Sequence, residues 1–150
     1  MDNLNEGHVN IMDELDSISE TFFRYKNKQM EKKYDDIPLK MNVNKYQILK
    51  SIYMNKECIV ADLVKKLELT SGATTLILNK LEEENLIARS RSTADRRLVF
   101  LELTDEGRRV YDILSKKRAE FLLKILNPLS AGEKDEFIRL FKKIADGLDQ

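Results

Sequence analysis

The chain has 150 residues, and its 26 basic and 26 acidic side chains give a formal net charge of zero at pH 7. This length suits one domain with a hydrophobic core, and the neutral total charge argues against strong non-specific binding to nucleic acid. The sequence shows no apolar run near the roughly 20 residues of a membrane span, no signal-peptide pattern, and one cysteine, which excludes an internal disulfide. We therefore expect a cytoplasmic protein that does not bind membranes.

The first predicted element is a long helix over about residues 8–34, because apolar side chains recur there at helical spacing. Its apolar face carries Ile11, Leu15, Ile18, Phe22 and Tyr25. The segment Ile37-Pro38-Leu39 should end this helix, since proline cannot continue one. The only histidine, His8, has no second strong metal ligand near it in sequence, so we expect it in a frayed terminus and not in a metal site.

A second helix and a short strand are predicted next. The sequence Asn44-Lys45-Tyr46-Gln47 indicates a capping box at the start of the helix. This helix should bury Tyr46, Leu49, Ile52 and Tyr53. The short apolar segment Cys58-Ile59-Val60 is typical of a strand, in which Cys58 is expected to be buried as a packing residue rather than to act as a redox sensor.

Residues 62–82 show the pattern of two short helices joined by a tight turn. Leu63, Val64 and Leu67 recur at helical spacing, and Thr70-Ser71-Gly72 supplies the chemistry of a turn and a helix N-cap. The second helix should bury Thr74, Ile77, Leu78 and Leu81 and expose Ser71, Ala73, Thr75, Leu76, Asn79 and Lys80. Such a helix-turn-helix can place its second helix in the major groove of DNA, although an ordinary helical hairpin gives the same pattern.

A two-stranded hairpin is predicted after this unit. Asn85 tolerates the left-handed conformation that ends a helix, and strands should follow over residues 86–91 and 99–103. Residues 86–98 carry four arginines, at positions 89, 91, 96 and 97, against one acid, Asp95, which gives a local charge of +3. Neighbouring arginines on a tight hairpin suit a narrow, negatively charged groove, although a solvated turn with an incidental Asp–Arg pair is the alternative.

Two further helices complete the chain. Thr104-Asp105-Glu106 should cap a long helix that Pro128 ends, and Ser130-Ala131-Gly132-Glu133 indicates a second capping box. The last helix carries Phe137, Leu140, Phe141, Ile144 and Leu148 on one face. The first and last helices have more apolar surface than a small DNA-binding unit could cover, so we expect a homodimer. The alternative is that these helices pack only on one another within the chain.

These motifs together resemble the MarR family (multiple antibiotic resistance regulators). The match covers residues 62–89, the Asp-X-Arg motif Asp95-Arg96-Arg97 and the segment Leu103-Thr104-Asp105-Glu106-Gly107. The resemblance implies a mainly α fold with a small β-wing, that is, a winged helix-turn-helix flanked by N- and C-terminal dimerisation helices. It implies a single MarR-like chain over 1–150, with the DNA-binding lobe at about 42–104 and dimerisation helices at about 8–34 and 105–148.

The function expected from the motifs and the resemblance is that of a sequence-specific transcriptional regulator. We expect a ligand-responsive repressor that binds a palindromic operator in double-stranded DNA as a dimer, with a small lipophilic or aromatic effector. The candidate DNA-binding residues are Thr70, Ser71, Gly72, Ala73, Thr75, Leu76, Lys80, Arg89, Arg91, Asp95, Arg96 and Arg97. The alternative function is a winged-helix module for protein–protein interaction that does not bind DNA.

Several features set limits on this interpretation. The sequence shows no nucleophile–base pair, phosphate-binding glycine loop or metal-ligand spacing, so we expect no enzyme, no cofactor and no metal. The family often has a basic or polar residue where Leu76 stands and a small hydroxyl residue where Val60 stands. Leu76 could contact a thymine methyl group, or it could indicate weak base readout. The tyrosines could line an effector pocket or serve only in packing; they are Tyr25, Tyr34, Tyr46, Tyr53 and Tyr111.

Overall fold

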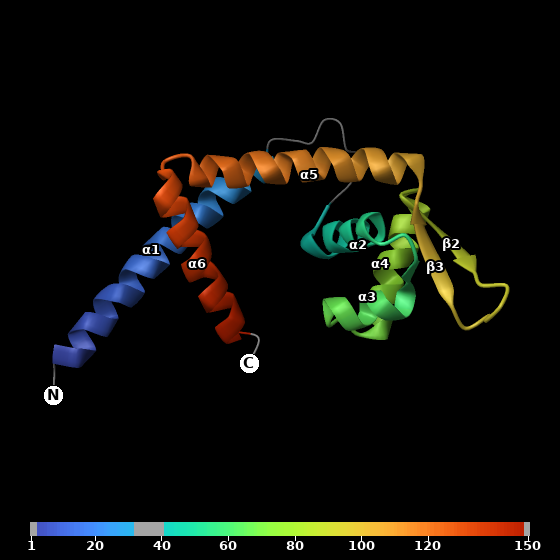
Figure 1. The fold of residues 1–150 in the computed structure, drawn as a ribbon, viewed down its shortest axis with the longest axis horizontal. Helices are drawn as coiled ribbons and strands as arrows, with labels where there is room; N and C mark the ends of the chain where they lie inside the picture. Colours follow the sequence, from blue (N-terminus) through green and yellow to red (C-terminus); the bar gives the residue numbers. More distant parts are fainter. Residues whose placement is uncertain (1–2, 32–40, 149–150) are drawn as a thin grey trace. The chain divides into compact units, whose positions relative to one another are not determined.

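The computed structural model describes residues 3–31 and 41–148. The chain divides into two compact units, residues 1–40 and residues 41–150 (Figure 1). The described elements are mostly helices, together with one three-stranded antiparallel sheet. This architecture confirms the predicted fold class, a mainly α protein with a small β-wing.

The first unit contains one described helix, α1 (Asn3–Glu31). It begins earlier than predicted, so His8 lies within a helix and not in a frayed terminus. The apolar side chains of its predicted face are exposed within the chain, with exposed fractions of 44–55% for Ile11, Leu15, Ile18 and Phe22. The predicted helix end at residue 34 and the break at residues 37–39 lie outside the described residues.

The second unit begins with α2 (Val43–Met54), whose N-cap differs from the prediction. Asn42, rather than Asn44, accepts a hydrogen bond from the backbone N–H of Lys45 at 2.9 Å. The backbone at Asn42 is extended, as an N-cap requires, so the helix starts one residue before Asn44. The prediction that Tyr53 is buried is also wrong, because Ile48, Leu49 and Ile52 form the buried face while Tyr53 is 47% exposed and Tyr46 is half-buried.

The predicted helix-turn-helix is confirmed as α3 (Val60–Leu67) and α4 (Ser71–Glu83). Glu68 ends α3 in the left-handed conformation, with φ of 52°. Thr70 is the N-cap of α4, and its hydroxyl accepts a hydrogen bond from the N–H of Ala73 at 3.2 Å. Thr74, Leu78 and Leu81 are buried as predicted, and Ile77 is half-buried. The opposite face of α4 is therefore available to a partner.

The sheet consists of β1 (Cys58–Ile59), β2 (Ile87–Arg91) and β3 (Val99–Leu103) in the order β1-β3-β2. Cys58 pairs with Leu101, and Arg91 pairs with Val99 at the far end of the hairpin. The predicted third strand is thus present, although Val60 already belongs to α3. Figure 1 shows the β2–β3 hairpin projecting from the helices of this unit as a wing.

A compact joint connects α4, the wing and α5 (Asp105–Leu126). Thr104 caps α5 by accepting from the N–H of Gly107 at 2.9 Å, and its hydroxyl donates to the carbonyl of Asn85 at 2.6 Å. Asn85 has φ of 56°, as predicted for a residue that reverses the chain after a helix. A Cβ atom on Gly107 would overlap the carbonyl oxygen of Leu86, which explains why the Leu-Thr-X-X-Gly segment ends in glycine.

The last helices differ in how much of their surface the chain covers. The first half of α5 packs against the winged helix and buries Val110, Tyr111 and Leu114. The predicted capping box at Ser130 and Glu133 is present, with Ser130 N–H donating to the Glu133 carboxylate at 2.8 Å. It starts α6 (Ala131–Leu148), in which no residue is buried within the chain. The apolar side chains of α6 are therefore left for a partner to cover.

Candidate nucleic-acid interface

The exposed face of α4 contains most of the candidate residues that the sequence indicated. Those exposed to solvent are Thr70, Ser71, Gly72, Thr75, Leu76 and Lys80, and Ala73 is half-buried. Leu76 has 71% of its surface exposed although it is a large apolar residue. No neighbouring atom lies within 4 Å of a Cβ atom built on Gly72, so packing within the chain does not require glycine there.

The hydroxyl groups at the start of α4 are engaged by the helix itself. Thr75 Oγ1 donates to the carbonyl of Ser71 at 2.8 Å, and Thr74 Oγ1 donates to the carbonyl of Thr70 at 3.0 Å. These bonds hold the hydroxyls against the backbone. The start of the helix is therefore defined by its own polar side chains, and the exposed Thr75 hydroxyl already donates its hydrogen within the helix.

The wing tip is organised around Asp95 and Arg97. The Asp95 carboxylate accepts from the backbone N–H of Arg97 at 3.0 Å and from Nε and Nη2 of the same residue at 3.1 Å each. These hydrogen bonds lower the pKa of the Asp95 carboxyl, and the bond from the Arg97 side chain contributes more than the bond from its backbone. The carboxyl is therefore ionised at neutral pH. The Arg97 side chain remains 90% exposed. The predicted Asp-X-Arg pair is confirmed, and it restrains the guanidinium while leaving it exposed.

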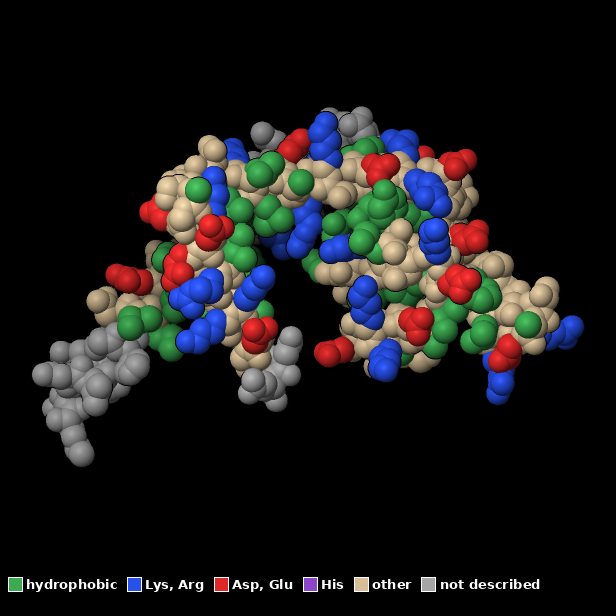
Figure 2. Space-filling view, viewed as in Figure 1, with side chains coloured by type: hydrophobic (Ala, Val, Ile, Leu, Met, Phe, Trp, Pro, Cys, Tyr) green, Lys and Arg blue, Asp and Glu red, His purple; other side chains and the backbone are tan. Residues whose placement is uncertain are grey.

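The other wing arginines fall into two groups. Arg91 and Arg96 are exposed, and Figure 2 shows basic side chains at the far end of the wing. Arg89 instead turns toward α4, where its Nη2 donates to Asn79 Oδ1 at 2.7 Å and its Nε lies 3.4 Å from Glu82 Oε2. Only a quarter of the Arg89 side chain is exposed. Arg89 therefore fixes the wing strand to α4.

Sequence reasoning missed a second link between α4 and the rest of the unit. The ammonium group of Lys45 on α2 donates to both carboxylate oxygens of Glu84, at 2.6 and 2.7 Å. The exposed fractions of the two side chains are 5% and 15%, so this ion pair is buried. The two residues are 39 positions apart, and no local motif marks them as partners. The pair holds the end of α4 against the start of α2.

Three of the five tyrosines form a cluster between α2 and α5. Tyr111 contacts Tyr53, with ring centroids 4.4 Å apart, and Tyr46, with centroids 6.0 Å apart. The Arg118 guanidinium lies over the Tyr46 ring at 5.5 Å from its centroid. Burial raises the pKa of Tyr111, which keeps its hydroxyl neutral. Tyr25 belongs to α1 in the other unit, and Tyr34 lies outside the described residues.

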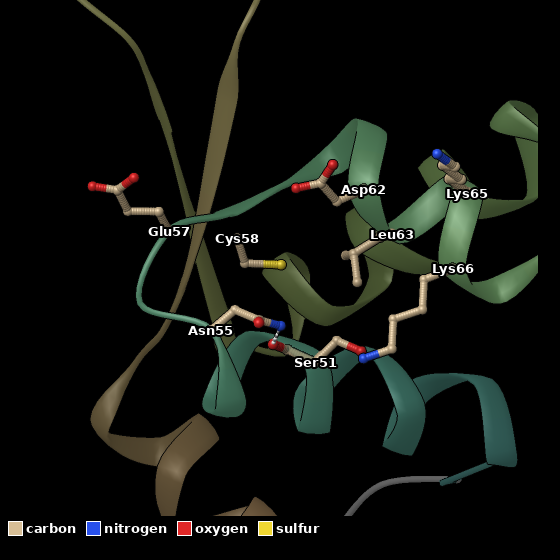
Figure 3. A pocket seen from close by; sticks show the side chains of 8 residues that line it. All are labelled: Ser51, Asn55, Glu57, Cys58, Asp62, Leu63, Lys65 and Lys66. Carbon is tan, nitrogen blue, oxygen red and sulfur yellow. Dashed lines mark hydrogen bonds between the residues drawn. The ribbon is translucent and has the colours of Figure 1, made fainter.

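Cys58 lies beside a pocket of about 460 Å³ between α2, β1 and α3 (Figure 3). The pocket is lined by Ser51, Asn55, Glu57, Cys58, Asp62, Leu63, Lys65 and Lys66. Burial, and then the nearby charge of Asp62, raise the pKa of the Cys58 thiol, while Lys66 opposes this shift. The thiol is therefore protonated and buried, with 3% exposure, as expected for a packing residue rather than a reactive cysteine.

In residues 3–31 and 41–148, no helix is long and apolar enough to cross a membrane. Within the same ranges, no group of three or more His, Cys, Asp or Glu side chains is arranged to hold a metal ion.

Comparison with known proteins identifies the family. The sequence model of the MarR family matches residues 41–99. The HTH-type transcriptional regulator YwhA of Bacillus subtilis is 34% identical over 76% of this chain and 84% of its own length. The HTH-type transcriptional repressor MdtR of the same species is 29% identical over 68% of this chain and 66% of its own length.

A solved structure extends the match to nearly the whole chain. The structure of Streptococcus pneumoniae FabT in complex with DNA has a TM-score of 0.77 and 22% identity, and it covers 95% of this chain and 97% of its own. At this identity the likeness concerns the fold. From the YwhA match and the family model, the chain belongs to the MarR family of winged helix-turn-helix transcriptional regulators.

Proposed function

We propose that this protein is a repressor that binds an inverted-repeat operator in double-stranded DNA as a homodimer. The single observation that carries the proposal is the wing tip, where hydrogen bonds to Asp95 restrain an exposed Arg97 guanidinium. A guanidinium fixed in this way loses little side-chain entropy when it enters a minor groove. The proposed activity is binding, with no catalytic step.

The proposed interface combines this wing with the exposed face of α4. We assign base contacts in the major groove to Ser71, Gly72, Thr75, Leu76 and Lys80, and minor-groove or phosphate contacts to Arg91, Arg96 and Arg97. Thr70 and Ala73 form the start of α4, whose backbone N–H groups can meet a phosphate. Asp95 and Arg89 act within the interface by positioning, because both bind other residues of the chain.

Charge distribution supports a DNA contact confined to these surfaces. The chain is neutral overall, whereas the hairpin over residues 86–98 carries four arginines against one acid. Binding should therefore be sensitive to salt but weak on unrelated DNA. A gel shift with the DNA upstream of the protein's own gene, with an unrelated duplex as competitor, tests the proposal. If no complex forms, or if the unrelated duplex displaces the upstream DNA at equal concentration of the two duplexes, the protein-interaction module is favoured instead.

The proposed division of the chain assigns DNA binding to residues of about 42–104 and dimerisation to about 8–34 and 105–148. The apolar side chains of the last helix support it, because α6 buries none of its residues within the chain. Phe137 and Phe141 stack on one another at 5.2 Å, yet 62% of Phe141 remains exposed. An exposed apolar face of this kind promotes association between two copies of the chain. A two-fold dimer then presents two wings and two α4 helices to an inverted repeat.

We expect the purified protein to have about twice the mass of its 17.5 kDa chain in light scattering. Phe141→Asp should shift it toward the monomer and weaken operator binding at the same time, because it places a charge in the apolar interface. Lys142→Asp, a charge change on the neighbouring exposed position, is the matched control and should remain dimeric. A wild-type monomer at micromolar concentration would contradict the dimer.

A small lipophilic or aromatic effector is the proposed signal for release. The tyrosine cluster between α2 and α5 supports this assignment, since it joins the helix that supports α4 to the helix that leads toward α6. An effector weakens DNA binding only if it binds the DNA-free state more tightly than the DNA-bound state.

We expect at least one compound from a panel of phenols, other aromatic acids and lipophilic antibiotics to lower operator affinity. Tyr53→Ala should weaken this response and leave affinity without the compound nearly unchanged, because Tyr53 is 47% exposed and contributes less packing than buried Tyr111. The measurement is fluorescence anisotropy of a labelled operator with and without each compound. A panel that leaves affinity unchanged would remove the support for ligand release.

A further inference from the structure

The exposed face of α4 contains an apolar side chain next to an amide whose orientation is fixed. Leu76 and Asn79 are three residues apart, so they are neighbours on the helix surface, and both are exposed. Thr75, beside them, turns its hydroxyl to the carbonyl of Ser71. The exposed Leu76 side chain therefore lies next to the Asn79 amide on this part of the helix.

Arg89 determines which atom of the Asn79 amide faces outward. Its guanidinium can only donate hydrogen bonds, so the amide oxygen must be the atom that it contacts at 2.7 Å. Glu82, one turn further along α4, forms an ion pair with the guanidinium, with its Oε2 at 3.4 Å from Arg89 Nε, but accepts no hydrogen bond from that atom. Among the described residues, none accepts a hydrogen bond from Asn79 Nδ2. Asn79 thus presents a donor to a partner and keeps its acceptor inside the chain.

This combination of groups matches one base edge in the major groove. Adenine presents the N7 acceptor next to its N6 amino donor, and it has no methyl group for Leu76 to contact. Cytosine presents an amino donor that would oppose Nδ2, and guanine presents acceptors but no methyl group. Thymine presents the O4 acceptor next to the C5-methyl group. Only thymine offers a partner to both Nδ2 and Leu76.

The geometry points to Leu76 and Asn79 as the residues that select a thymine in each half of the operator. Leu76 covers the C5-methyl group and Asn79 Nδ2 donates to O4, while Arg89 is a positioning residue that keeps the amide in this orientation. Gly72 lies one turn before Leu76 on the same face, and the empty space at its Cβ position leaves room for DNA to approach. This inference rests on the proposed function and specifies the base that it recognises.

The test begins with a pool of DNA duplexes that have a randomised centre of about 20 base pairs, which is the length of two half-sites. The duplexes that bind the protein are selected from this pool. Each selected thymine is then replaced by deoxyuridine, which removes only the methyl group. We expect one symmetric pair of positions at which this replacement lowers wild-type affinity about fourfold per half-site, the effect of losing one buried methyl group. Leu76→Ala should bind the thymine and uracil duplexes equally, while Met54→Ala, an exposed apolar residue outside α4, should respond as wild type.

A second variant tests the amide. Asn79→Asp replaces the donor by an acceptor, and Arg89 can still pair with the new carboxylate, so the wing contact is retained. We expect its preference at the same position to change from thymine to cytosine. This inference alone is overturned if binding is sequence-specific but Leu76→Ala still loses affinity when thymine is replaced by deoxyuridine. It is also overturned if Asn79→Asp still prefers thymine at that position. Duplexes selected without any common sequence would overturn the proposed function together with it.

Discussion

Lys45→Met is expected to lower the free energy of unfolding by about 3 kcal/mol, measured by denaturant unfolding at fixed protein concentration. The substitution removes the ammonium group that both oxygens of Glu84 contact and leaves the carboxylate largely buried without its counter-charge. Breaking a buried pair in this way costs about 3–5 kcal/mol, and the residual exposure of Glu84 places the effect at the lower end.

Two further variants separate this explanation from a simple loss of packing. Replacing both partners, in Lys45→Met with Glu84→Leu, should restore most of the stability, because no unpaired charge remains. Arg109→Met, which breaks the exposed pair with Glu106, should change stability by less than about 1 kcal/mol. If the double variant is as unstable as Lys45→Met, the unpaired Glu84 charge is not the cause of the lost stability. The same conclusion follows if Lys45→Met and Arg109→Met lower stability equally.

The sequence predicted those parts of the fold that depend on neighbours in the chain. Thr70, Thr104 and Ser130 cap their helices through residues three positions later, so their roles follow from local spacing. The Asp95–Arg97 pair is equally local. The cap of α2 was predicted wrongly because Asn42 and Asn44 offer the same chemistry two residues apart, and tertiary packing of Ile48, Leu49 and Ile52 decides the register.

Contacts between polar residues of different elements could not be predicted in the same way. Lys45 and Glu84, like Arg89 and Asn79, belong to separate elements, and any of the chain's many charged or polar side chains could have been their partners. Arg89 illustrates the consequence. Its sequence position groups it with the wing arginines, whereas the structure gives it a positioning role against α4. The periodicity of apolar residues indicated which helix faces a dimer would cover, but it does not show which surface packs against them.

Arg97→Ala is expected to lower operator affinity by about 1–3 kcal/mol per half-site, which corresponds to about 5- to 150-fold for each wing. The guanidinium extends from the wing tip with 90% of its surface exposed, so its removal leaves the fold intact and deletes the contact with the narrow groove. The slope of affinity against salt concentration should become shallower, because fewer counterions are released on binding.

Two related variants show whether geometry contributes beyond charge. Asp95→Ala should cost less than Arg97→Ala, since it removes the orienting carboxylate but keeps the positive charge. Arg97→Lys should recover only part of the lost affinity, because lysine lacks the planar fork that contacts both carboxylate oxygens. Affinities at two salt concentrations, with circular dichroism as the check on folding, distinguish these outcomes. Wild-type affinity in Arg97→Ala would mean that the wing does not bind DNA and that recognition depends on α4 alone.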